Sequence, residues 1–259
     1  MAEFAPHIDI FKIINRLSSF AISIFWTILV LSLIPFVLDQ FSIANNISDF
    51  INVLNIIGIS SFFIIEIVIE FILLPQAYSK RRDDFIDNSF GSKFSTKNSI
   101  GYYDNDEIGK GLYKASVNLF ENCFFTFSLA KIVTTSRILI PSLMLIAMSI
   151  FAYYGFKEVP FALSILQALF SANILGSLIK HLILINKLSA IQDSWIGLFQ
   201  QEDFKNETFK YQTNIYRFWL QYETLHSKIS AGIPNSVFDK HNDLLTKEWE
   251  EIKSKYNIK

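Results

Sequence analysis

The chain has 259 residues, 51% of them apolar, and a formal net charge of −1 at pH 7. The near-neutral charge excludes binding to nucleic acid through an overall basic field. The single cysteine, Cys123, excludes an internal disulfide framework and a metal site built from several cysteines.

Four apolar stretches have the length of a membrane span: residues 17–38, 51–74, 138–156 and 159–179. A hydrocarbon core about 30 Å thick needs roughly 20 apolar residues in a helix, and a helix satisfies its own backbone polar groups within lipid. The first stretch is longer than the apolar part of a signal peptide, and no small-residue cleavage site follows it, so we expect it to remain as a span. The sequence therefore predicts an all-α, polytopic membrane protein with four transmembrane helices in two hairpins.

Lys and Arg in the connections predict the orientation of the spans. They are absent from residues 39–50 and frequent in the N-terminal tail, in the connection before the third span and after the fourth. Both termini and the middle connection are therefore expected in the cytoplasm. The expected divisions are an N-terminal tail with the first hairpin (1–76), a cytoplasmic insert (77–137), the second hairpin (138–179) and a cytoplasmic helical tail (180–259).

Two carboxylates interrupt the second span, Glu66 and Glu70. They lie four residues apart and so on one helical face, which continues back to Asn55. A carboxylate within the membrane costs a few kcal/mol, so it normally faces protein or water. Three interpretations stay open: a pore-lining or ion-coordinating pair, a structural pair bonded to other spans, or two interfacial residues that pair with Lys80 or Arg81.

Polar residues in the fourth span include Gln167 and Asn173. Small and polar residues let helices in a membrane pack closely and form hydrogen bonds with each other. We expect these two residues to serve such packing, with pore lining as the alternative.

The insert begins with Lys80, Arg81 and Arg82. The simplest interpretation is a stop-transfer cluster at the level of the lipid headgroups, and binding of an anionic messenger is the alternative. In the tail, apolar residues at helical spacing predict helices over residues 180–200 and 206–231, and a third that begins near residue 235. Aromatic residues at Phe209, Tyr216, Trp219 and Tyr222 predict that the second tail helix packs in a small bundle or an oligomer seam.

Motifs of enzymes and cofactor sites are missing from the sequence. The histidines His7, His181, His226 and His241 do not have the spacing of metal ligands, and neither a phosphate-binding loop nor a nucleophile elbow occurs. The sequence therefore predicts no enzymatic activity, no metal site and no cofactor.

Short motifs in the insert point to a known family. Residues 83–91 read DDFIDNSFG, an acidic and aromatic stretch after the second span, and residues 118–125 read NLFENCFF before the third. Between them, residues 101–105 read GYYDN. With its two hairpins, insert and helical tail, the chain resembles the four-transmembrane pore-forming effectors encoded beside bacterial cyclic-nucleotide synthases in antiphage defence.

The resemblance implies that a homo-oligomer permeabilises the bacterial inner membrane in abortive infection, when a cyclic nucleotide or a cytoplasmic protein triggers it. It also implies a regulatory insert that contains Phe85, Asp87, Phe90, Tyr103, Asn118 and Glu121, beside the basic cluster. The expected partners are the lipid bilayer and the trigger, and no nucleic acid. Two other functions stay open: a non-catalytic membrane scaffold that recruits a cytoplasmic partner through its tail, and a small constitutive channel.

Overall fold

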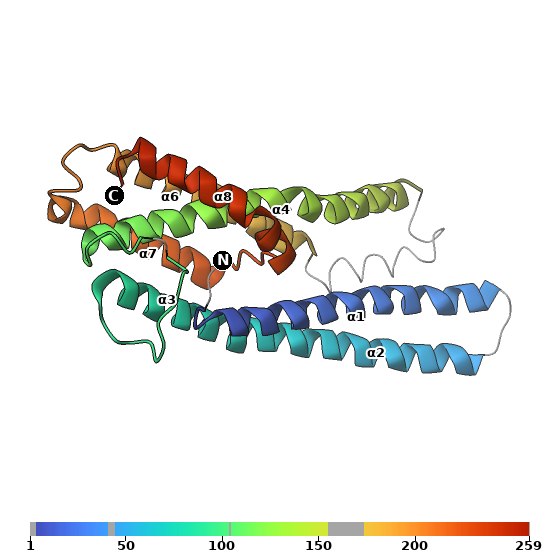
Figure 1. Cartoon of the computed structure of the whole chain (residues 1–259). Coiled ribbons are helices and arrows are strands. Elements are labelled where there is room, and N and C mark those ends of the chain that lie inside the picture. The colour runs from blue at the N-terminus through green and yellow to red at the C-terminus, as the bar shows by residue number, and fades with distance from the viewer. Residues whose placement is uncertain (1–3, 41–44, 104, 155–173, 259) are drawn as a thin grey trace. The chain divides into compact units, whose positions relative to one another are not determined.

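The computed structural model describes residues 4–40, 45–103, 105–154 and 174–258, and every regular element in these ranges is helical. This confirms the predicted all-α class. The elements are α1 (Ile8–Gln40), α2 (Asn45–Val68), the π-helical turn η1 (Ile69–Leu73), α3 (Leu74–Phe90), α4 (Leu112–Tyr154), α6 (Ile174–Phe199), the 3₁₀ turn η2 (Thr208–Tyr211), α7 (Gln212–Lys228) and α8 (Asn235–Lys255) (Figure 1).

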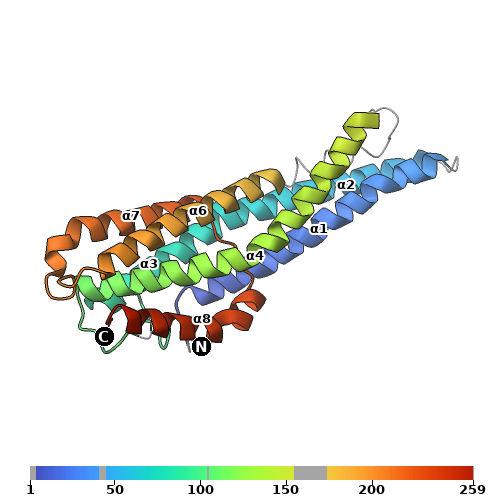
Figure 2. The same cartoon turned by 90° about the horizontal axis from the view of Figure 1, so that it is seen from above.

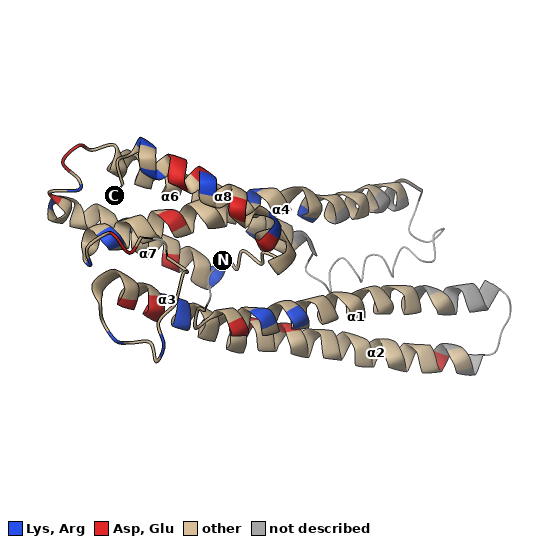
Figure 3. Cartoon of the chain, viewed as in Figure 1, with Lys and Arg blue, Asp and Glu red and all other residues tan. Residues whose placement is uncertain are grey.

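Three helical runs of the described chain are long and apolar enough to cross a membrane: residues 8–32, 49–90 and 112–150. The first three predicted spans each begin within one of these runs. The fourth, 159–179, falls largely outside the described residues, as do Gln167 and Asn173, so a four-span topology stays a prediction. Charged residues are sparse along most of α1 and α2 and frequent on α3, α7 and α8 (Figure 3).

The chain divides into two compact units. Residues 1–12, 74–134 and 180–259 form one, here called the core unit, and residues 13–73 and 135–179 form the other, here called the span unit. The predicted insert and the predicted tail thus fold together in the core unit, which also takes in the N-terminal segment.

Aromatic and aliphatic side chains from α4, α6, α7 and α8 share the interior of the core unit. The ring of Phe120 on α4 has its centroid 5.3 Å from that of Phe199 and 5.2 Å from that of Trp249. Trp195 of α6 contacts Phe218 of α7 at 5.2 Å. Burial of this apolar surface is the main favourable contribution to the folding of the unit.

The predicted aromatic stripe of the second tail helix is divided between the core and the surface of the chain, and its alternative role as an oligomer seam stays a prediction. Tyr222 is buried and Trp219 contacts Phe85, but Phe209 and Tyr216 are exposed. Phe209 lies in η2, before α7 begins, and α7 turns Ile215 rather than its neighbour Tyr216 into the core. The 3₁₀ turn therefore removes Phe209 from the helical register that the sequence pattern assumed, whereas Tyr216 lies on the exposed side of α7 itself.

In the span unit, α1 and α2 lie side by side as a hairpin (Figures 1 and 2). A Cβ atom added at Gly58 would lie 2.9 Å from Cγ1 of Ile28, so a glycine is needed where the two helices approach. Nearby, Phe25 and Phe62 have ring centroids 6.4 Å apart, and Asn55 Nδ2 donates to Ser32 Oγ at 3.4 Å. Such small and polar contacts are typical of helix pairs in membranes.

The π-helical turn η1 comes directly before Leu74 and Pro75. Proline has no N–H to donate to the carbonyl of Phe71, four residues earlier, and its ring would collide with that carbonyl in a regular α-helix. A wider turn at this point accommodates the ring, so the helical run from α2 into α3 continues through Pro75.

Candidate regulatory site in the core unit

A network of buried side-chain amides joins three segments of the insert. Asn105 donates from Nδ2 to Oδ1 of Asn118 at 2.9 Å and to Oε2 of Glu121 at 2.7 Å. Asn118 in turn donates to Oδ1 of Asn88 at 2.9 Å and to Oγ of Ser89 at 3.2 Å. Because Asn105 and Asn118 are fully buried, each hydrogen bond replaces one that water would otherwise make. The network fixes the loop before α4 to the end of α3.

Two buried carboxylates hold the loop that follows α3. Asp87 accepts hydrogen bonds from Ser92 Oγ and from the backbone N–H groups of Phe94 and Ser95, all within 2.8 Å. Asp84 accepts one from the N–H of Ser99 at 2.7 Å. The turn into the loop uses Gly91, which has φ +75° and donates its N–H to the carbonyl of Asp87, as helix C-termini often do. The loop is thus held in one conformation.

Aromatic rings cover one side of α3. Phe85 contacts Tyr103 at a centroid distance of 6.5 Å and Trp219 of α7 at 5.2 Å. Phe90 stacks on Trp219 at 6.3 Å with an interplanar angle of 18°. Asn118 and Glu121 thus share one polar network, while Phe85, Phe90 and Tyr103 line the aromatic face. Their proposed regulatory role stays a prediction.

The side chain of Arg81 is only 11% exposed. Its Nη1 donates to Tyr222 Oη and its Nη2 to Glu223 Oε1, each at 3.4 Å, and the latter contact is also an ion pair. The guanidinium carbon lies 5.4 Å from the ring centroids of both Tyr78 and Tyr222. The positive charge is therefore balanced by one carboxylate and two aromatic faces.

This burial corrects the interpretation of the basic cluster. Lys80 and Arg82 are exposed, as a stop-transfer cluster requires, but Arg81 points into the core unit. Arg81 forms its ion pair with Glu223 of the same unit, and the third interpretation of Glu66 and Glu70 stays a prediction.

Two buried histidines lie close to Arg81. His226 contacts the ring of Tyr222 at 4.4 Å and that of Tyr78 at 5.9 Å, and His7 contacts Tyr102 at 5.0 Å. Burial, with the charge of Arg81 as a second cause, holds the pKa of His226 well below its ordinary value. The same two causes lower the pKa of His7 to about 3. Both rings are neutral at physiological pH.

The polar residues predicted for the membrane interior lie in the span unit. Glu66 and Glu70 are exposed, whereas Asn55 is half-buried and bonded to Ser32 on α1. Asn55 therefore contributes to packing between α1 and α2. The two glutamates do not.

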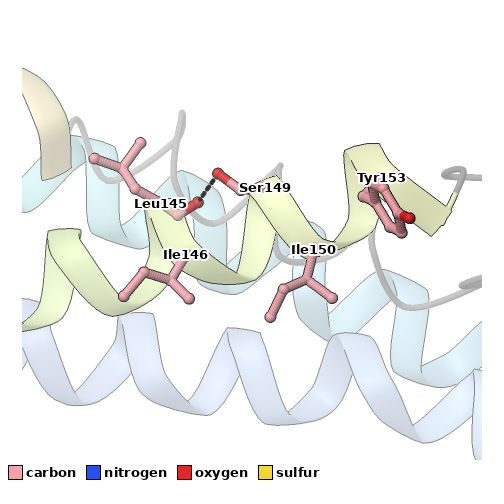
Figure 4. A pocket seen from close by; sticks show the side chains of 5 residues that line it. All are labelled: Leu145, Ile146, Ser149, Ile150 and Tyr153. Atoms are coloured by element: carbon pink, nitrogen blue, oxygen red, sulfur yellow. Dashed lines mark hydrogen bonds between the residues drawn. The ribbon is translucent and has the colours of Figure 1, made fainter.

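Two cavities lined by described residues differ in the chemistry of their lining. One, of about 390 Å³, is lined by apolar side chains of α4 and by Ser149, whose hydroxyl donates to the carbonyl of Leu145 (Figure 4). Its lining offers little to a polar ligand. The other, of about 450 Å³, is lined by Glu107, Glu250, Lys253, Ser254 and Ile258, and Lys253 already pairs with Glu250 at 2.6 Å. Two carboxylates and one paired ammonium disfavour a phosphate-bearing messenger there.

Within the described ranges, no group of three or more His, Cys, Asp or Glu side chains could hold a metal ion. Comparisons of the chain with protein-family models, with curated proteins and with solved structures find no match.

The sequence pattern missed several members of the site. In the sequence, Asn105 is only the last residue of the motif 101–105, and Asp84 is only one member of the acidic and aromatic stretch 83–91. Lys114 is buried and pairs with Asp106 at 3.3 Å, although nothing in the sequence around it predicts burial. Three consecutive basic residues, Lys80, Arg81 and Arg82, likewise do not indicate that the middle one is buried.

Proposed function

We propose that the chain is a multi-pass membrane effector of bacterial antiphage defence. In this proposal the core unit receives a cytoplasmic signal, and spans of several copies then permeabilise the inner membrane. The insert motifs 83–91 and 118–125 support the assignment through their resemblance to pore-forming effectors. Burial of Asp87, Asn118 and Glu121, taken from those motifs, supports a folded regulatory insert rather than a flexible linker.

The observation that carries the proposal is the exposure of Glu66 and Glu70, the two charged residues of the apolar stretch 51–74. A carboxylate that faces lipid costs a few kcal/mol, and in the described structure neither side chain is covered. A second copy of the chain, or a water-filled path between copies, would remove this cost. Exposure of both carboxylates therefore favours an oligomer that encloses a polar path.

The test is the membrane potential of bacterial cells after induced expression, with and without a co-expressed cyclic-nucleotide synthase and with and without phage infection. We expect depolarisation and dye uptake only when a trigger is present. Membrane fractionation verifies that the chain is inserted. An intact potential under every trigger, with the chain in the membrane fraction, contradicts the proposal, and depolarisation without any trigger indicates the constitutive channel instead.

A non-catalytic scaffold is the second candidate, because exposed apolar side chains remain on the tail. Phe209 is 76% exposed and Leu220 66% exposed, and Tyr216 lies one turn from Leu220 on α7. A scaffold would use this surface to recruit a partner and would never change membrane conductance. The variant Tyr216→Ser/Leu220→Ser should then lose the partner, whereas an effector should keep its triggered depolarisation.

A further inference from the structure

Arg81 is a buried cation at a junction of four segments of the core unit. Three of these segments continue into candidate membrane spans, and the fourth belongs to the tail. Arg81 lies in the helical run 49–90, α4 belongs to the run 112–150, and the N-terminal segment leads into the run 8–32. The tail contributes α7. All the contacts described below lie within the core unit.

The direct contacts join α3 to α7. The planar guanidinium of Arg81 donates to Tyr222 and Glu223 from two different nitrogen atoms, a geometry that the single ammonium of a lysine cannot reproduce. Tyr78, one turn earlier on α3, donates to Ser230 Oγ at 3.3 Å just beyond α7. At 3.4 Å the Arg81 contacts are near the outer limit for hydrogen bonds, so the junction is specific but reversible.

Tyr222 extends the junction to α4. Its hydroxyl donates to the carbonyl of Asn122 at 3.3 Å and lies 3.2 Å from Oγ1 of Thr126. Phe11, at the start of α1, extends it to the N-terminal segment, because its ring lies 5.7 Å from that of Tyr78. A displacement of α7 would therefore change the surroundings of α1, α3 and α4 together.

We propose that Arg81, Tyr222 and Glu223 form a latch, and that its opening frees α7 from α3 and passes the signal from the core unit to the spans. The effect on the spans rests on the proposed function, whereas the latch itself concerns only the core unit. Glu223 is the most accessible member, with 19% of its side chain exposed, so a ligand or partner protein can reach this carboxylate first.

Three variants separate the latch from general destabilisation. Glu223→Gln keeps the shape of the side chain but removes the charge that pairs with Arg81. Arg81→Lys keeps the buried charge but loses the two-pronged donor. Arg82→Gln is the matched control, since it removes the neighbouring positive charge on the exposed side of α3.

Hydrogen–deuterium exchange of the full chain in lipid nanodiscs measures whether α7 is released. We expect backbone amides of 215–228 to exchange about tenfold faster in Glu223→Gln and Arg81→Lys, because a hydrogen bond to a charged group contributes at least that factor. Amides of 245–253 in α8 should keep wild-type rates, as should both helices in Arg82→Gln. If α7 exchanges at the wild-type rate in Glu223→Gln and Arg81→Lys, the latch does not exist. If exchange in these variants is accelerated equally in α7 and α8, the effect is general destabilisation and the latch is likewise wrong.

The membrane potential then tests its role in control. We expect Glu223→Gln to depolarise cells without a trigger, and Arg82→Gln to need one. If wild-type chain depolarises only with a trigger and Glu223→Gln still needs it despite a released α7, the controlling role of the latch is wrong. If no chain depolarises the cells under any trigger, although α7 is released in Glu223→Gln and Arg81→Lys, the proposed effector function is wrong. The latch within the core unit is then still supported.

Discussion

The side-chain amide of Asn105 lies 2.7 Å from Oε2 of Glu121, in the interior of the core unit. Asn105 belongs to the loop before α4, and Glu121 lies more than two turns into that helix. The contact therefore brings two short sequence motifs, 101–105 and 118–125, into one buried cluster. Loop conformation and helix packing are stabilised by the same hydrogen bonds.

Replacement of Asn105 by alanine tests this cluster. The variant deprives the Glu121 carboxylate and the Asn118 side chain of a donor in a buried site, so we expect a loss of about 2–3 kcal/mol in the free energy of unfolding. Thermal unfolding in detergent, followed by near-ultraviolet circular dichroism, measures the change. Asn98→Ala, at an exposed position, should stay within about 0.5 kcal/mol of wild type. Equal stability of the two variants would contradict the assignment.

Stability should fall on mild acidification because of His226. Its folded-state pKa lies well below its ordinary value, so only the unfolded chain takes up this proton as the pH falls below about 6.5. The stabilisation is complete above that pH and decreases below it, by up to about 1.4 kcal/mol per pH unit. His7 acts with the same sign, down to its pKa of about 3.

Melting temperatures of wild type and His226→Phe at pH 8, 6.5 and 5 check this dependence. Below pH 6.5, where the unfolded chain binds the proton, the variant should lose about half of the wild-type pH dependence and His7 should supply the rest. Identical slopes in the two proteins would show that His226 is not the titrating group.

Gly58→Ala should weaken the α1–α2 hairpin. The new Cβ would lie 2.9 Å from Cγ1 of Ile28, closer than side chains tolerate, and we expect a loss of about 1–3 kcal/mol. Adding Ile28→Ala to Gly58→Ala removes the opposing side-chain atoms and should recover part of the lost stability. In the matched control Gly197→Ala, the new Cβ meets no atom within 4 Å in α6, so this variant should stabilise by about 0.5–1 kcal/mol. Thermal unfolding in detergent micelles compares all three.

Glu66→Gln/Glu70→Gln should abolish or strongly reduce triggered depolarisation. The amides keep the shape of the side chains but cannot carry the negative charge that attracts cations to a polar path. Ser60→Ala, on the exposed side of the same helix, is the control and should behave as wild type. Cells that depolarise equally with all three chains, at equal amounts in the membrane, would rule out a role for the carboxylates in a pore.

Much of the fold was predictable because it depends on local pattern. Long apolar runs predict helices, and those at 17–38 and 51–74 coincide with α1 and the helical run from α2. The 3₁₀ turn before α7 was not predictable, since nothing in residues 208–211 breaks a helix, and so Phe209 was assigned to the wrong face. The π-helical turn likewise depends on how the chain accommodates Pro75 and not on a recognisable motif.

The site was less predictable, because its contacts join residues far apart in sequence. Arg81 and Glu223 are separated by 142 positions, and no periodicity links them. The resemblance to family motifs names Asn118 and Glu121, but nothing in the motifs indicates that Asn105 bonds both of them or that Ser89 accepts from Asn118. Burial of a cation or an amide is decided by the helices that come to cover it.

The contact between Phe120 and Trp249 has a consequence for how the chain is made. At about 5–20 residues per second, Trp249 leaves the ribosome roughly 6–26 s after Phe120. During that interval the part of α4 that α8 covers in the folded core unit stays exposed. A nascent chain is therefore exposed to proteases and chaperones until α8 closes the core unit. A ribosome that stalls before α8 would release a chain that has the hydrophobic helices but lacks the helix that completes the core unit. Proteases can degrade such incomplete chains.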